Sequence, residues 1–257
     1  SIVGPTASGK TKLSVELAKH FNGEIVSADS MQIYRGMQIA TAKPTKEEMD
    51  GIPHHMMDFL PPDKTYSVAS YVTDASKCIA DIHSRGKLPF IVGGTGLYVD
   101  SLLNNVSFSD DKRDEEYCLE LRKIAEEHGT DRLLEMLAKF DPKSADRLRE
   151  SRNLKRIIRA IEFYKTTGKT ITQQIEESYK IPSPYITVKI GLNCRDRQVL
   201  YDRINKRVDI MLEEGLLEEA ERVINSDLSY TSIKAIGYKE LIPYFKENKN
   251  LNDCVEK

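Results

Sequence analysis

The first residues whose types and spacing could do chemistry are Gly4 to Thr11, which read GPTASGKT. They fit the pattern G-x-x-x-x-G-K-[ST], in which a glycine-rich turn points successive backbone N–H groups at a phosphate. Lys10 would reach the outer phosphate oxygens, and the Thr11 hydroxyl would face a Mg²⁺ ion. Ile2 and Val3 indicate a strand before the loop, and apolar residues at helical spacing follow it. This context predicts a phosphate-binding loop.

A carboxylate follows the second predicted strand, Glu24 to Ala28. Asp29 opens the stretch DSMQIYRGM and is the only acid that directly follows a predicted strand. Beside a phosphate loop, such a group can hold Mg²⁺ through water or accept a proton from the group being modified. An alternative is that Asp29 only caps a helix, since Asp favours that position.

A second glycine-rich turn, Gly93 to Gly96 (GGTG), follows the apolar strand Lys87 to Val92. Its glycines allow a ligand to approach the backbone closely, and Thr95 offers a hydroxyl. Alone, the turn is equally consistent with a tight strand-to-helix connection. The pair His54-His55 lacks a nearby third ligand, so we interpret it as structural or as part of a loop.

The elements that must position these residues alternate between strand and helix, with a helix expected over Ser67 to Ser84. This order predicts an α/β fold: a P-loop NTPase-like, doubly wound parallel sheet whose strand ends share one ligand site. After residue 105 the pattern becomes helical until Tyr185 to Leu192, which we expect to rejoin the sheet before one long helix, Arg197 to Asn225. We therefore predict a catalytic core in two parts, 1–105 and 185–257, and a helical insertion, 106–184.

Within the insertion, the predicted helix Arg152 to Thr166, closed by Gly168, carries an apolar stripe and an opposite basic face. Between Arg147 and Lys169 there are eight Lys or Arg and two Glu. A face of one charge sign on a nearly neutral protein favours a polyanionic partner, although a solvated face is an equal alternative. Further basic residues begin the helix after the returning strand, and two of them share a face and could close over a phosphate: Arg203 and Arg207.

Composition limits the classes of protein. The 257 residues carry a net charge of −2, so the chain as a whole does not attract nucleic acid. Its four cysteines stand singly, which argues against a zinc site or a disulfide framework. No apolar run approaches the ~18 residues of a membrane span. We expect a cytoplasmic protein that acts as a monomer, without membrane contact, and we expect further residues beyond both ends of the chain.

Taken in order, several stretches together resemble one family, the bacterial tRNA dimethylallyltransferases, also called tRNA isopentenyltransferases. The similarity covers nearly the whole chain, and the order of its motifs is more specific than any one of them. The stretches are GPTASGKT, SADSMQIYRGM, ATAKP, HHMMD, YSVASY, VGGTGLY, NLKRIIRAIEFY, LYDRINKRVDIMLEEGLLEEA and AIGYKEL.

The resemblance implies that dimethylallyl diphosphate occupies the loop and that its dimethylallyl group moves to the exocyclic amine of the adenosine 3′ of the anticodon, in tRNAs reading codons that begin with U. It implies Asp29 as general base, Thr95 lining the reaction channel, and Lys10, Thr11 and Arg207 gripping the diphosphate, with Mg²⁺ assisting. The implied donor-binding residues are Gly4, Pro5, Thr6, Ala7, Ser8, Gly9, Lys10 and Thr11. The implied contacts to the tRNA anticodon stem-loop are Asp29, Ser30, Met31, Gln32, Lys155, Arg156, Ile157, Ile158 and Arg159.

Three alternatives remain open from the residues. A nucleotide or small-molecule kinase would use the same loop with ATP as donor. A non-catalytic RNA-binding protein could use the loop as a nucleotide switch, which leaves Asp29 unexplained. The acceptor could also be a free adenine nucleotide, although the basic insertion favours tRNA.

Overall fold

The computed structural model describes residues 1–106, 114–226, 232 and 235–255 and divides the chain into two compact units. Ser1–Leu103 and Tyr185–Lys257 form the first unit, and Asn104–Pro184 forms the second. Sequence analysis placed the first boundary after residue 105 instead of 103. Within the described residues, no helix is both long and apolar enough to cross a membrane.

The first unit is built on a five-stranded sheet in the order β3-β2-β4-β1-β5, and all of its strand pairs are parallel. Parallel pairing without hairpins is the expected result of strands alternating with helices. The predicted α/β fold is therefore confirmed. The strands are β1 (Ile2–Val3), β2 (Gly23–Ser27), β3 (His54–His55), β4 (Leu88–Gly93) and β5 (Ile190–Gly191).

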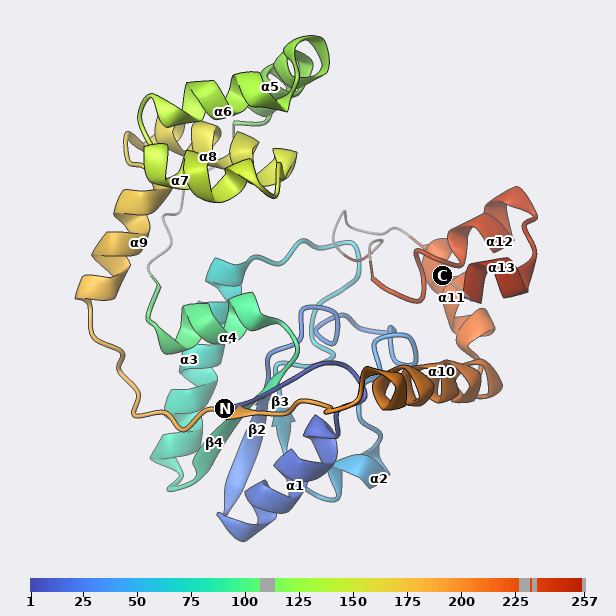
Figure 1. Ribbon diagram of the computed structural model, residues 1–257. Coiled ribbons are helices and arrows are strands. Elements are labelled where there is room, and N and C mark those ends of the chain that lie inside the picture. The colour runs from blue at the N-terminus through green and yellow to red at the C-terminus, as the bar shows by residue number, and fades with distance from the viewer. Residues whose placement is uncertain (107–113, 227–231, 233–234, 256–257) are drawn as a thin grey trace. The chain divides into compact units, whose positions relative to one another are not determined.

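Helices cover both faces of this sheet (Figure 1). Alternate residues of one strand enter different cores: Ile25 packs with Val15 and Ala18 of α1 (Lys10–His20), whereas Val26 packs with Ala75 and Ile79 of α3 (Val68–Ser84). This alternation follows from the two-residue period of a strand. The short α2 (Lys46–Met49) precedes β3, and α4 (Gly96–Leu103) packs on the α3 side.

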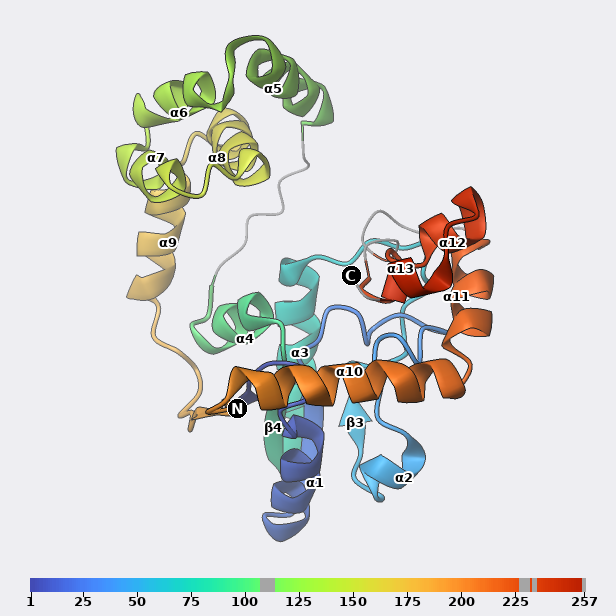
Figure 2. The ribbon, with the colours of Figure 1, turned by 45° about the vertical axis from the view of Figure 1, so that its right-hand side comes forward.

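Two expectations for the second part of the core were wrong. The predicted strand Tyr185 to Leu192 is a strand only at Ile190–Gly191, where it pairs with β1 at the sheet edge. The predicted single helix from Arg197 to Asn225 is two helices, α10 (Arg197–Glu213) and α11 (Leu216–Ile224), seen as separate in Figure 2. Gly215 separates them, because its φ of 98° lies in the left-handed region that interrupts a helix.

A further core joins the segment after β2 to the C-terminal helices. Ile33, Tyr34 and Met37 are fully buried against α11 and Tyr238. The short helices α12 (Ile242–Glu247) and α13 (Leu251–Val255) complete this group. We call α11, Tyr238, α12 and α13 the C-terminal helical lobe. The segment that begins at Asp29 packs against this lobe.

The second unit contains helices around its own apolar core, in agreement with the helical insertion that the sequence predicts. Helix α8 starts two residues later than predicted, because Asn153 caps it by accepting a bond from the Arg156 N–H and Arg152 has a positive φ of 44°. The predicted end at Gly168 is confirmed. The helices are α5 (Glu115–His128), α6 (Thr130–Ala138), α7 (Pro142–Arg149), α8 (Leu154–Thr167) and α9 (Ile171–Lys180).

A buried carboxylate near the start of β2 links three elements of the first unit. Glu24 is 1% exposed and accepts hydrogen bonds from Arg85, from Lys87 at 2.7 Å and from His55 Nε2 at 2.7 Å. The bond from Arg85 holds the pKa of Glu24 well below its usual range, burial opposes this effect, and Lys87 and His55 add to it. His55 therefore has a structural role, as expected, although it lies in an edge strand instead of a loop.

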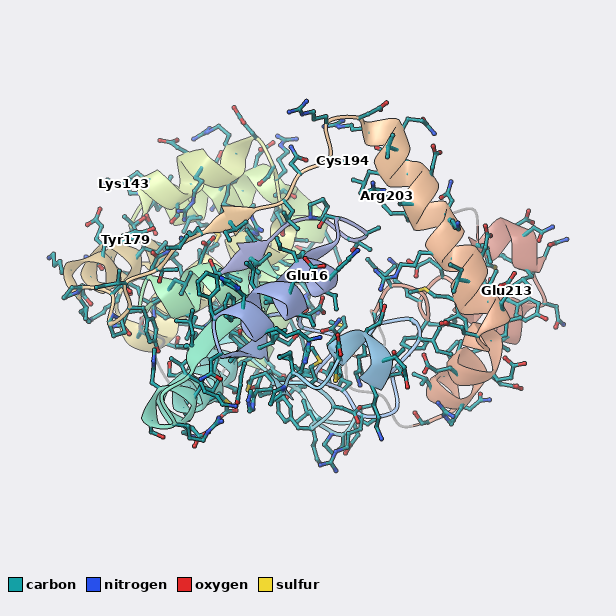
Figure 3. The ribbon with its side chains drawn as sticks, turned by 90° about the horizontal axis from the view of Figure 1, so that it is seen from below. Glu16, Lys143, Tyr179, Cys194, Arg203 and Glu213 are labelled. Atoms are coloured by element: carbon teal, nitrogen blue, oxygen red, sulfur yellow. The ribbon has the colours of Figure 1, made fainter. Side chains whose placement is uncertain are left out.

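We predict that Glu24→Gln lowers the free energy of unfolding at pH 7 by about 2 kcal/mol, because Arg85, Lys87 and His55 lose their buried carboxylate partner. A depressed carboxyl pKa stabilises the fold above the unfolded-state value of 4.5 and loses that effect as the pH falls. Urea titrations should therefore show a smaller gap between variant and wild type at about pH 3. The control is Glu16→Gln on the exposed side of α1 (Figure 3); equal stability of Glu24→Gln and wild type at pH 7 would contradict the prediction.

Candidate active site

The phosphate loop has the backbone conformation that its sequence predicted. Gly9 adopts a φ of 88° and Ala7 a φ of 60°, so the chain curls before α1 begins at Lys10. This curl directs backbone N–H groups and the positive end of α1 toward one point. The Ser8 hydroxyl is buried within the loop and has no hydrogen-bond partner among the described residues.

Lys10 folds back over the loop. Its ammonium donates to the carbonyl oxygens of Gly4 at 3.0 Å and Pro5 at 2.7 Å. Burial lowers the pKa of Lys10, Asp29 acts to raise it, and Arg207 acts to lower it. Asp29 and Arg207 can act on the pKa of Lys10 only from nearby. Three predicted site residues from three different parts of the first unit therefore lie near one another. Two weak carbonyl acceptors could be exchanged for phosphate oxygens at little cost.

Asp29 occupies the turn directly after β2. Its Oδ1 accepts a hydrogen bond from the Met31 N–H at 2.9 Å, which fixes the direction of the carboxylate. No helix begins at this position, so the capping alternative does not hold. Ser30 and Met31 lie in the same turn and are partly exposed.

Thr95 is bonded directly to that turn. Its Oγ1 accepts from the Ser30 N–H at 3.0 Å, and its own N–H donates to the carbonyl of Ala28 at 3.1 Å. The two loops can approach so closely because Gly93 has no side chain: a Cβ there would lie 2.2 Å from the Ala28 carbonyl oxygen. Thr95 therefore positions the Asp29 turn in addition to lying beside it.

Tyr98 and Tyr34 lie near Asp29, although no motif in the sequence indicates this. Burial, Tyr34 and Asp29 together raise the pKa of Tyr98 to about 12, which places the Tyr98 hydroxyl near both groups. Tyr98 stacks on Tyr71 with ring centroids 4.1 Å apart. The hydroxyls of Tyr34 and Tyr71 are buried without a hydrogen-bond partner among the described residues. All three rings are almost fully buried, at 5% exposure or less, and therefore belong to the core.

The Gln32 side chain links the end of β2 to the loop at residues 41 and 42. Its Oε1 accepts from the Ser27 hydroxyl at 3.0 Å, and its Nε2 donates to the carbonyls of Thr41 at 3.4 Å and Ala42 at 3.1 Å. Both ends of the side chain are therefore bonded within the protein. Gln32 also lines, with Lys10 and Thr11, a cavity of about 40 Å³, large enough for a water molecule or two.

Arg207 lies on α10, none of whose residues is buried (Figure 3 labels Arg203 and Glu213 on this helix). It has no carboxylate partner within residues 1–106, 114–226, 232 and 235–255. Together with Lys10, it leaves the mouth of the phosphate loop with more positive than negative charge. An anion would remove this imbalance.

The residues present also fit a magnesium ion bound together with a phosphate ligand. Thr11 supplies a hydroxyl at the start of α1 and Asp29 a carboxylate, and oxygen is the donor that Mg²⁺ prefers. The described part of the chain holds no cluster of three His, Cys, Asp or Glu side chains. Such a sparse set suits Mg²⁺, which keeps several waters and shares phosphate oxygens instead of filling a protein cage.

The predicted basic face of the second unit is partly neutralised by internal ion pairs. Arg152 bonds to Asp131 at 2.5 Å, and Arg159 pairs with the buried Glu162 on the next helical turn. The side chains of Ile157 and Ile158 are buried in the core, so a partner could reach only the basic members of that stretch. Arg156 and Lys155 are exposed.

Two family models together match the whole chain. A model described as IPP transferase covers residues 32–257, and one described as isopentenyl transferase covers residues 1–59. Two curated relatives are named tRNA dimethylallyltransferase. The protein of Halalkalibacterium halodurans is 49% identical over 100% of this chain and 81% of its own length. That of Bacillus cereus is 51% identical over 99% of this chain and 80% of its own.

Solved structures resemble the fold over almost the whole chain. The full-length tRNA isopentenylpyrophosphate transferase of Bacillus halodurans is 45% identical, with a TM-score of 0.68 over 99% of this chain and 79% of that one. A eukaryotic dimethylallyltransferase described as acting on tRNA is 31% identical, with a TM-score of 0.77 over 99% of this chain and 64% of that one. The site and these comparisons agree: the chain belongs to the IPP transferase family, that of the tRNA dimethylallyltransferases.

Proposed function

We propose that this protein transfers a dimethylallyl group from dimethylallyl diphosphate to the exocyclic amine of the tRNA adenosine 3′ of the anticodon. The observation that carries the proposal is that a phosphate loop, two cations and one oriented carboxylate, Asp29, lie near one another at one edge of the sheet. The loop and cations suit a diphosphate, and the carboxylate suits the amine. Family membership supports this reaction over phosphoryl transfer, because the relatives are named as tRNA dimethylallyltransferases.

In this reaction the bond between the allylic carbon and the bridging oxygen breaks, and its electron pair leaves on diphosphate. Lys10, Arg207 and the loop N–H groups stabilise the charge that develops on that oxygen. Mg²⁺, when bound at Thr11, neutralises further phosphate charge. The exocyclic nitrogen forms the new bond to carbon and gives up a proton, which Asp29 accepts. Because Oδ1 of Asp29 is bonded to Met31, we assign the proton to Oδ2.

The tRNA must present its adenine out of the stacked anticodon loop to reach Asp29. We assign the stem contacts to the exposed basic residues Lys155 and Arg156, which would bind phosphates and position the RNA without reading its sequence. We further propose that the protein acts as a monomer.

The deciding experiment supplies labelled dimethylallyl diphosphate, ATP and unmodified tRNA together. We expect label to enter tRNA, diphosphate to be released and ATP to remain. Consumption of ATP with transfer of its phosphate would support the kinase alternative instead. Prenylation of free adenine nucleotides but not of tRNA would move the acceptor to the small-molecule class.

Lys10→Ala should abolish transfer while leaving the melting temperature close to that of the wild type. Among the described residues the Lys10 ammonium donates to two loop carbonyls, so its removal costs little stability but removes the main charge that would face the diphosphate. Steady-state assays and thermal melts check this. Activity equal to wild type would exclude the loop from the reaction.

Asp29→Asn should lower turnover about a hundredfold or more, because the amide keeps the shape of the carboxylate but not its basicity. Binding of tRNA should change little, since a carboxylate does not attract phosphates. Single-turnover assays at several Mg²⁺ concentrations distinguish the two roles of Asp29. Restoration of the rate by added Mg²⁺ would assign Asp29 to the metal, and a near-normal rate without added metal would show that it is not the base.

Arg156→Glu should weaken tRNA affinity and lower the slope of log affinity against log salt by roughly one. Arg156 is the sharper test than Arg159, which is already paired with Glu162. The matched control is Lys123→Glu, an exposed charge reversal on α5 of the same unit. Filter-binding titrations at several salt concentrations measure both variants. If they behave alike, α8 is only a solvated face.

A further inference from the structure

A second buried carboxylate, distant in sequence from the site, binds a backbone loop that leads into it. Glu219 of α11 is 5% exposed, and its two oxygens accept from the N–H groups of three consecutive residues. The distances are 2.9 Å from Gln38, 2.8 and 3.0 Å from Ile39, and 3.1 Å from Ala40. The Tyr238 hydroxyl donates a further bond at 2.7 Å. A row of N–H groups of this kind is an anion site, and here an internal anion fills it.

The loop held by Glu219 is the same loop that holds Gln32. Its carbonyl groups at Thr41 and Ala42 accept the two bonds from Gln32 Nε2. The loop is closed on itself by the Lys43 N–H, which donates to the Gln38 carbonyl at 3.1 Å. A displacement of residues 38–40 would therefore be transmitted to the Gln32 side chain through a short, rigid turn.

Gln32 in turn closes the segment that begins at Asp29. Its other end accepts from Ser27, the last residue of β2, so Gln32 ties the loop to the strand that Asp29 follows. The turn between them is pinned by the bond from Met31 to Asp29. Hydrogen bonds joined by short stretches of backbone thus connect Glu219 on α11, through the 38–42 loop and Gln32, to the turn that holds Asp29.

We propose that Glu219 is a positioning residue for prenyl transfer, and that the C-terminal helical lobe sets the alignment of Asp29 through it. The inference rests on the proposed function, because alignment matters only if Asp29 accepts the proton. A neutral residue cannot replace the carboxylate: the amide of Gln would turn an NH₂ group toward N–H donors and leave at least one of them unbonded.

The test compares Glu219→Gln with Glu221→Gln, an exposed neighbour on the same helix. We expect Glu219→Gln to lower kcat about tenfold, because a small misplacement of a reacting group is costly, while KM for dimethylallyl diphosphate stays unchanged. Glu221→Gln should match wild type in both. A merely structural Glu219 would lower the melting temperature and leave kcat of the folded enzyme at the wild-type value, which would overturn the inference.

A double-mutant cycle with Gln32→Ala then tests the path. If Glu219 acts through Gln32, the double variant should lose no more than about the loss of the worse single variant, whereas independent effects would multiply. Multiplying effects would overturn the proposed path. Should Glu219→Gln fail to fold, Tyr238→Phe removes one of its bonds and should still lower kcat a few-fold; an unchanged kcat would also overturn the inference. Absence of transfer by the wild type would instead refute the proposed function itself.

Discussion

The site depends on the parallel register of three strands. Val3 of β1 lies opposite Gly93 of β4, and Ser27 of β2 lies opposite Val92. The three strands therefore end within a residue of one another, and whatever follows each strand meets at one edge. The phosphate loop, Asp29 and Thr95 are those following residues. A register slip of one residue would move each side chain to the opposite face of the sheet and separate them.

Charge is the second constraint, because Asp29 is the one carboxylate that acts on Lys10 beside the second cation, Arg207. The pKa of Lys10 is lowered by burial and by Arg207, and only Asp29 opposes this. Elsewhere the protein pairs its less exposed charges internally, as Glu24 with Arg85 and Glu162 with Arg159 show. A protein that satisfies these charges but leaves Lys10 and Arg207 facing the loop has an arrangement suited to a multiply charged ligand.

Much of this could be predicted from local sequence, because local signals determine it. The loop glycines, the apolar run of β4 and Gly168 after α8 act within a few residues, and the structure has them where they were expected. The wrong expectations concern the lengths of two elements. Helical periodicity continues across Gly215, but the positive φ of that residue divides the helix in two. The apolar run from Tyr185 to Leu192 pairs with β1, which is only two residues long, so only Ile190–Gly191 forms a strand.

Contacts between distant residues could not be predicted at all. Glu219 reads as one acid among several on an amphipathic helix, and nothing nearby indicates that it binds amides about 180 positions earlier. Arg152 reads as part of a free basic face until Asp131, 21 positions earlier, is placed beside it. Single-sequence patterns show which residue types are present, but not which partners neutralise them.

A phosphate loop can also serve a reaction that transfers a carbon group instead of a phosphoryl group. The loop recognises only the anion, so it holds a diphosphate equally well as a leaving group or as the remainder of a donor. The reaction is decided by what faces the loop. Here an oriented carboxylate, Asp29, follows β2 and can accept a proton from an amine. The proposed chemistry thus depends on Asp29, which follows β2. The position of its carboxylate depends in turn on the 38–42 loop and on α11, which hold that segment in place.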